Sequence, residues 1–173
     1  MKLLVPDIYK KSIYDIDYDK LLNSGIKCLL FDLDNTCSGY LDKAPSSKLK
    51  KLFLKLERLG FRVILFSNSS ASKLEAYSNL KVILHPSSRK PFKKYFLRLL
   101  NKYNYSSDEV VIIGDQLFTD ILGGNRVGIK TCLVDPMTSD DYIFTKLFFR
   151  TWERVVFRMF YKKNILIKGE YYE

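Results

Sequence analysis

Cysteine and histidine are scarce in this chain. It has only three cysteines, Cys28, Cys37 and Cys132, and one histidine among 173 residues. No two cysteines form a CxxC pair, and three thiols cannot all be matched, so the composition is unlike that of a disulfide framework. It favours a reducing compartment, and we expect a cytoplasmic protein.

Long apolar runs are also missing. The apolar start of the chain meets Pro6 and Asp7 too early to form the core of a signal peptide. No later stretch reaches about 18 uncharged apolar residues, the length needed to cross a bilayer. The sequence therefore predicts no membrane-spanning helix.

Acidic residues are in the minority. Lys and Arg number 29 against 19 Asp and Glu, which gives a formal net charge of +10. An excess of this size favours anionic partners, such as phosphate esters, nucleic acid or an anionic membrane surface.

Strand-like and helix-like segments alternate along the chain. The hydrophobic patterns predict strands at 27–33, 61–66, 82–84, 110–113 and 131–134, and helices at 46–59, 70–80 and 91–103. This alternation predicts an α/β fold with an open, doubly wound, mostly parallel sheet. In such sheets ligands bind beyond the carboxyl ends of the strands, so those ends are where functional residues are expected.

The C-terminal part of the chain has a different pattern. We expect a core at 1–136 and a basic, amphipathic, helical tail at 137–173. Within 142–163 the apolar residues recur at helical spacing. The same segment holds six Lys and Arg but only one acid, Glu153. Such a helix can lie on an anionic membrane, or its apolar side can pack on the core. The sequence supports both interpretations.

Polar residues follow the expected strand ends. In chain order they are Asp32 and Asp34, then Ser67 and Asn68, then Lys90, and finally Asp115 and Asp120. Close carboxylates repel each other by about 4 kcal/mol at an effective dielectric constant near 20. A cation must offset this repulsion, and because the segments offer only oxygen ligands, Mg²⁺ is favoured over zinc. A carboxylate nucleophile, a metal ion and a lysine together predict phosphoryl transfer through an aspartyl-phosphate.

These segments, taken in order, resemble the signature of the haloacid-dehalogenase (HAD) superfamily. The resemblance implies that Asp32 is the nucleophile and a metal ligand, and that Asp34 is the general acid/base. It implies that the Asp34 carbonyl and the Asp115 carboxylate complete the metal site. The phosphoryl group would be held by Ser67, Asn68 and Lys90, and Asp120 would orient Lys90 or a metal-bound water.

The short spacing between the motifs leaves no room for the cap domain that many members carry. Segments 37–66 and 68–89 are largely used by the expected helices and strands. The site should therefore be open, and uncapped members tend to act on phosphates carried by something large, whose own body closes the site.

Nearly the whole chain resembles one uncapped group, the YqeG-like phosphatases of subclass IIIA. The most specific match is the stretch 114–126, whereas Ser69 stands where a second Asn is usual. This group is similar to the mitochondrial phosphatidylglycerophosphate phosphatases. The resemblance implies hydrolysis of a lipid headgroup phosphate by a protein that is peripheral on the inner face of a membrane.

Two other functions remain open at this point. One is a soluble phosphatase for sugar phosphates, nucleotides or phosphoproteins. The other is a non-enzymatic basic binding module that retains the fold, for example for RNA. The complete set of Asp32, Asp34, Lys90 and Asp115 argues against the module. Because no aromatic and basic RNA-binding motif is present, we expect no nucleic-acid partner.

Overall fold

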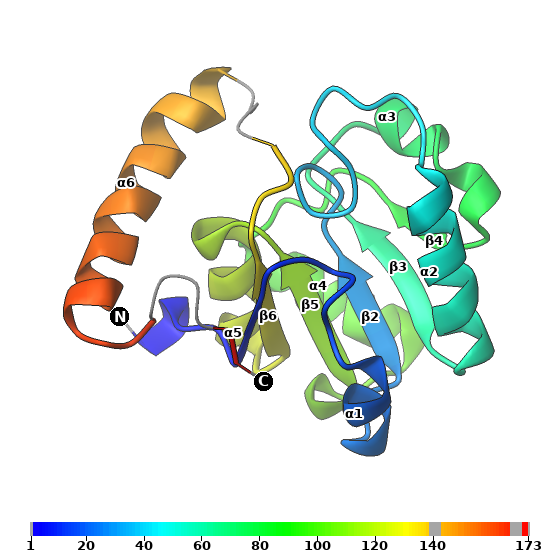
Figure 1. The fold of residues 1–173 in the computed structure, drawn as a ribbon. Helices are drawn as coiled ribbons and strands as arrows, with labels where there is room; N and C mark the ends of the chain where they lie inside the picture. The colour runs from blue at the N-terminus through cyan, green and yellow to red at the C-terminus, as the bar shows by residue number, and fades with distance from the viewer. Residues whose placement is uncertain (1, 139–142, 167–170, 173) are drawn as a thin grey trace.

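A single parallel sheet forms the centre of the molecule (Figure 1). The computed structural model describes residues 2–138, 143–166 and 171–172, with the side chains of 143–150 outside the description. The six strands are β1 (Ile8–Lys10), β2 (Cys28–Phe31), β3 (Arg62–Phe66), β4 (Ile83–His85), β5 (Val110–Gly114) and β6 (Lys130–Val134). Their order is β1-β6-β5-β2-β3-β4, and every neighbouring pair is parallel. The predicted fold class is confirmed.

Helices cover both faces of the sheet. One face carries α1 (Tyr18–Asn23), α2 (Ser47–Arg58) and α3 (Ala71–Glu75), and the other carries α4 (Lys93–Tyr103) and α5 (Leu122–Val127). In β2, Leu29 and Phe31 pack in the cluster that contains α2, whereas Cys28 and Leu30 pack in the cluster that contains α4. Since successive side chains of a strand point to opposite faces, a strand buried on both faces is apolar throughout.

The first strand and the first helix were not predicted from the sequence. β1 has only three residues, too few to show a period, and it forms through parallel pairing with β6. Its other edge is met by the C-terminal segment, where Tyr9 and Tyr172 each donate a backbone N–H to the other's carbonyl at 2.9 Å. In α1, the side chain of Asp17 accepts a hydrogen bond from the Lys20 N–H and caps the helix.

The predicted helix over 70–80 is wrong in its second half. α3 ends at Glu75, and a separate 3₁₀ turn follows at Ser78–Leu80. Between them, the side chain of Tyr77 is fully buried, and its hydroxyl donates to Ser38 Oγ at 2.8 Å. Leu74, Tyr77 and Leu80 are all buried at a spacing of three residues. This spacing fits one helix as well as a short helix followed by a 3₁₀ turn, so the pattern could not show the break.

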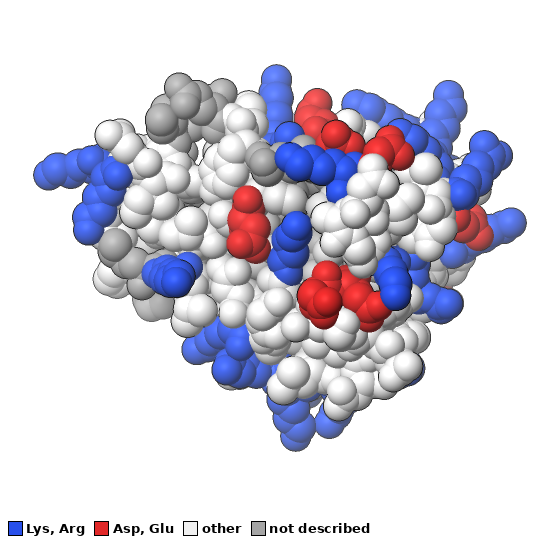
Figure 2. Space-filling view, turned by 90° about the horizontal axis from the view of Figure 1, so that it is seen from below, with Lys and Arg blue, Asp and Glu red and all other residues white. Residues whose placement is uncertain are grey.

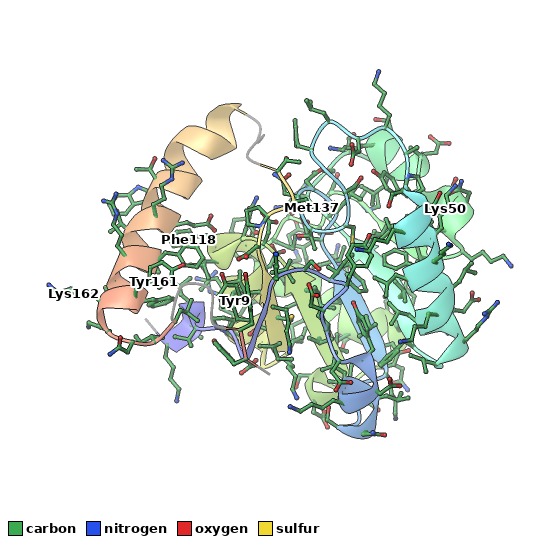
Figure 3. All side chains as sticks on the ribbon, viewed as in Figure 1. Tyr9, Lys50, Phe118, Met137, Tyr161 and Lys162 are labelled. Carbon is green, nitrogen blue, oxygen red and sulfur yellow. The ribbon has the colours of Figure 1, made fainter. Side chains whose placement is uncertain are left out.

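The longest helix, α6 (Ile143–Lys162), lies along the flank of the sheet beside β1 and β6. Its inner face contacts a π-helix, η4 (Leu117–Ile121), and Figure 3 shows Phe118 and Tyr161 between α6 and the sheet. Val156 and Phe160 are buried there. The first part of the predicted amphipathic pattern has its side chains outside the described part. This applies to the apolar residues Phe144, Leu147 and Phe148 and to the basic residues Lys146 and Arg150.

The single acid of this helix faces inward. Glu153 is buried, and its Oε1 accepts a hydrogen bond from the Leu117 N–H at 2.7 Å, at the start of η4. The helix thus contributes a polar contact as well as an apolar one to the core.

The basic residues are spread widely over the surface. Figure 2 views the molecule from the amino ends of the strands, and Lys and Arg project around most of the outline, with fewer Asp and Glu among them. Within the described ranges, no helix combines the length and the apolar character needed to cross a membrane.

We predict that α6 contributes to the stability of the fold. Replacing Phe160 by Ala removes a fully buried ring, and the free energy of unfolding in urea should fall by about 3–5 kcal/mol. Trp152→Ala is the matched control on the same helix, because Trp152 is exposed, and should change this free energy by less than about 0.5 kcal/mol. Equal and small effects of both changes would show that α6 does not pack on the sheet in solution.

Candidate active site

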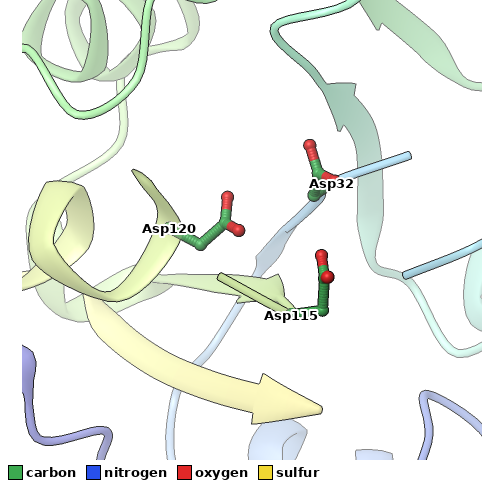
Figure 4. A group of neighbouring side chains, drawn as sticks. All are labelled: Asp32, Asp115 and Asp120. Carbon is green, nitrogen blue, oxygen red and sulfur yellow. The ribbon is translucent and has the colours of Figure 1, made fainter. Parts of the chain in front are cut away.

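Three buried carboxylates meet at the carboxyl edge of the sheet. Asp32 follows β2 and Asp115 follows β5, its neighbour in the sheet, whereas Asp120 lies within η4. One oxygen from each of the three lies within 4.8 Å of the others (Figure 4). The parallel pairing of β2 and β5 brings their ends together, as the sequence predicted.

A lysine lies among these acids. The Nζ of Lys90 donates to Asp32 Oδ1 and to Asp120 Oδ1, each at 2.6 Å, and its side chain is almost fully buried. Its single charge faces three carboxylates, so the cluster retains an excess of acid.

Burial and charge act in opposite directions on these groups. Burial raises the pKa of Asp32 to about 8, Lys90 opposes this rise, and Asp120 and Asp115 add to it. Burial alone would lower the pKa of Lys90, but the adjacent Asp120 and Asp32 outweigh it, so its pKa lies above the ordinary value. The lysine therefore stays charged, and the site favours a further cation beside Asp32.

The residues after β3 hold Lys90 in place. The amide of Asn68 forms two hydrogen bonds with the Lys90 backbone, accepting from its N–H at 2.8 Å and donating to its carbonyl at 3.2 Å. Ser67 is buried, and its Oγ accepts from the Ser69 N–H at 3.1 Å. The structure thus brings both residues to the site, and their predicted contacts with a phosphoryl group stay predictions.

Asp34 has partners of its own, separate from the three carboxylates. Its Oδ2 accepts from Ser69 Oγ, and its Oδ1 accepts from Lys73 Nζ. Lys73 also donates to the Tyr40 carbonyl at 2.7 Å and lies over the Tyr40 ring. Sequence reasoning missed the roles of Ser69 and Lys73. The signal that could have indicated them is that a serine and a lysine follow the second motif closely.

Two further contacts shape the acid cluster. Thr36 Oγ1 donates to Asp115 Oδ1 at 3.0 Å and so links the two strand ends directly. At Gly114, an added Cβ would collide with the Asp120 side chain, which explains why glycine precedes Asp115. The close approach of β5 to η4 thus depends on the missing side chain.

The cluster fits a hard divalent cation. Asp32, Asp115 and Asp120 offer only oxygen atoms, are buried and lie close together, which suits Mg²⁺ better than a softer metal. Asp120 already accepts hydrogen bonds from Lys90 and from Thr119 Oγ1. Both oxygens of Asp120 are thus engaged within the chain, Oδ1 with Lys90 and Oδ2 with Thr119.

Comparison with known proteins gives a consistent family. The model of a family described as HAD-hydrolase-like matches residues 87–138. The chain is 33% identical to "Probable phosphatase YqeG" of Bacillus subtilis, over 94% of this chain and 95% of that protein. It is 25% identical to "Phosphatidylglycerophosphate phosphatase 1, chloroplastic/mitochondrial" of Arabidopsis thaliana, over 95% of this chain and 50% of that protein, so it spans half the length of the plant relative.

Solved structures share the fold at low identity. One is 3-deoxy-D-manno-octulosonate 8-phosphate phosphatase from Yersinia pestis, with a TM-score of 0.54 and 21% identity, over 65% of this chain and 66% of that chain. A likeness at this level of identity shows the fold alone.

We predict that Lys90 stabilises the fold as well as the site. Lys90→Met leaves three buried carboxylates without their ammonium, and the free energy of unfolding in metal-free buffer should fall by about 3–5 kcal/mol. Urea unfolding measures this change. Lys93→Met, at an exposed position three residues along the chain, is the control and should have almost no effect. An unchanged stability of Lys90→Met would mean that the acids do not depend on this lysine.

Proposed function

We propose that this chain hydrolyses the phosphomonoester of a lipid headgroup, that of phosphatidylglycerophosphate. The chain belongs to the YqeG-like family of the HAD superfamily and is a phosphatase. The observation that carries the phosphoryl-transfer chemistry of this proposal is the pairing of Asp32 with the Lys90 ammonium at 2.6 Å in a buried cluster of acids. Because the chain is a phosphatase, the alternative of a non-enzymatic binding module is not retained.

The first step would form a covalent intermediate. An oxygen of Asp32 attacks phosphorus, the bond from phosphorus to the leaving oxygen breaks, and Asp34 gives that oxygen its proton. The products of this step are the free alcohol and an aspartyl-phosphate at Asp32. Lys90 offsets the negative charge that gathers on the phosphoryl group, and Ser67 and Asn68 would hold its oxygens.

The second step would release phosphate. Asp34, now ionised, takes a proton from a water molecule, and this water attacks the phosphorus of the aspartyl-phosphate. The bond from phosphorus to the Asp32 oxygen breaks, so the nucleophile is regenerated. The separate surroundings of Asp34, with Ser69 and Lys73 as its partners, support a separate role for it.

Mg²⁺ is the metal that we propose for the site. Asp32, Asp115 and the backbone carbonyl of Asp34 would hold it, and Asp120 would orient Lys90. When bound, the metal supplies positive charge next to the phosphoryl oxygens. The fit of the buried oxygen ligands to a hard cation supports this choice.

The choice of a lipid substrate has two supports. The first is the similarity to the plant phosphatidylglycerophosphate phosphatase, which is 25% identical over 95% of this chain. The second is the open site, because the chain between β2 and β3 holds only loops and α2, and that between β3 and β4 holds only loops, α3 and one 3₁₀ turn. We propose that the protein works at the cytoplasmic face of an anionic membrane.

The test is phosphate release from phosphatidylglycerophosphate in mixed micelles. We expect release by the wild type with Mg²⁺, none with chelator, and a loss on the order of a thousandfold or more in Asp32→Asn, which lacks the nucleophile. Asp108→Asn is the control and should keep full activity, because Asp108 is exposed just before β5, at the opposite end of that strand from Asp115.

The same assay with soluble esters separates activity from substrate. Metal-dependent release from glycerol 3-phosphate or nucleotides, with none from the lipid, would replace the lipid substrate by a soluble one. Full activity of Asp32→Asn would contradict the mechanism itself.

A further prediction concerns the lysine that contacts Asp34. Lys73→Met removes one partner that positions the general acid, so kcat/KM on an alkyl phosphate, whose leaving oxygen needs a proton, should fall by about tenfold to a hundredfold. The kcat/KM on p-nitrophenyl phosphate should change little, because kcat/KM reports the first step and this leaving group departs without a proton.

Two comparisons complete this test. Lys73→Arg should restore much of the alkyl phosphatase activity, because it keeps a cation beside Asp34. An equal fall in kcat/KM on both substrates in Lys73→Met would indicate a general structural role and contradict the prediction.

A further inference from the structure

Three exposed apolar side chains lie at the carboxyl edge of the sheet, the edge that holds the site. Leu41, Phe92 and Met137 are 72%, 63% and 48% exposed. They lie on three separate loops, which follow β2, β4 and β6 at the carboxyl edge of the sheet. We call these three residues the carboxyl rim.

Each member of the rim is tied closely to the site. Phe92 comes two residues after Lys90 in the sequence. Met137 donates its backbone N–H to the Asn35 carbonyl at 2.8 Å, next to Asp34, and Figure 3 shows it at this edge of the molecule. Leu41 follows Tyr40, whose carbonyl binds the lysine that contacts Asp34. The three residues therefore lie close to residues of one site although they are far apart in the sequence.

Exposed cations lie beside two of the three rim residues. Lys43 lies beside Leu41, and Arg89, Lys93 and Lys94 lie beside Phe92. Two acids lie near the rim residues. Asp42 accepts hydrogen bonds from the Gly39 N–H at 2.7 Å and from Ser38 Oγ at 3.0 Å. Asp135, two residues before Met137, accepts hydrogen bonds from the Tyr9 hydroxyl at 2.6 Å and from the Tyr171 hydroxyl at 2.7 Å. Arg89 bonds the Tyr95 hydroxyl at 2.8 Å and keeps its charge at the surface.

We infer that the carboxyl rim is the surface through which this protein docks on an anionic lipid bilayer, with the opening of the site facing the headgroups. Apolar side chains enter the interface between headgroups and acyl chains, and nearby Lys and Arg bind the anionic phosphates. The inference rests on the proposed lipid substrate, because a headgroup that stays in the membrane reaches Asp32 only if this edge faces the bilayer.

The outer face of α6 is the competing surface. It exposes Trp152 and Val155 at 55% and 49%, with Arg154 and Arg158 beside them. However, α6 runs along the flank of the molecule, from the carboxyl edge toward the amino edge (Figure 1). A bilayer lying flat on this helix would face the side of the sheet, and the substrate phosphate would be held away from the site.

The test measures binding to vesicles that contain phosphatidylglycerol and phosphatidylcholine. Three sets of serine variants are compared with the wild type in a flotation assay: the rim set Leu41→Ser, Phe92→Ser and Met137→Ser; the helix set Leu54→Ser and Leu97→Ser; and the α6 set Trp152→Ser and Val155→Ser. Leu54 and Leu97 are matched controls, since they are 43% and 46% exposed on α2 and α4. Urea unfolding of each set checks that the fold is intact.

We expect the rim set to lower the partition onto vesicles by about tenfold or more, because apolar contact in the interface is lost. The other two sets should bind as the wild type does, and vesicles of phosphatidylcholine alone should bind the wild type weakly. Each of four results would overturn the inference: full binding by the rim set, loss of binding in the α6 set, equal binding of the wild type to neutral vesicles, or no binding by the wild type.

The substrate proposal and the docking inference can fail separately. If the protein releases phosphate from the lipid in micelles but the rim set still binds vesicles, the substrate proposal is supported and the docking surface is wrong. Vesicle binding that depends on the rim, with no release from the lipid, would keep the docking surface and remove the substrate.

Discussion

The buried ammonium of Lys90 is the contact on which the arrangement of the carboxyl edge depends. It binds Asp32 at the end of β2 and Asp120 in η4, while Asn68 after β3 fixes its backbone. One residue from the loop after β4 thus joins the ends of three other segments. Without it, close carboxylates would repel each other by about 4 kcal/mol per pair at an effective dielectric constant near 20. The parallel sheet brings the acids together, and the lysine allows them to stay there.

Sequence reasoning located the residues whose positions follow from topology alone. Asp32, Lys90 and Asp115 follow strands or precede a helix, and the carboxyl ends of parallel strands share one edge whatever the details of packing. Lys73 could not be located in this way, because its contact with Asp34 depends on where α3 begins. The strand β1 was missed for a related reason, since it is defined by its pairing with β6 rather than by a pattern of its own.

Contacts far from the chemistry support the same residues. Glu153, the single acid of α6, lies inward, and its carboxylate accepts a hydrogen bond from the N–H of Leu117, the first residue of η4. η4 carries Asp120, which binds Lys90. A continuous chain of contacts therefore leads from the outer helix to the nucleophile, and it passes through a turn that the glycine at 114 allows to come close.

The pairing of Tyr9 with Tyr172 bears on self-association. An edge strand with free backbone groups is a template on which another molecule can add its own strand. At β1 the chain's own C-terminal segment occupies that position, and the rings of Tyr171 and Tyr172 lie against Tyr9 at 5.0 and 6.4 Å between centroids. The opposite edge, β4, offers only three residues. The C-terminal segment therefore covers one edge of the sheet, and the other edge strand is too short to pair well with another molecule. Both features disfavour polymerisation through the sheet edges.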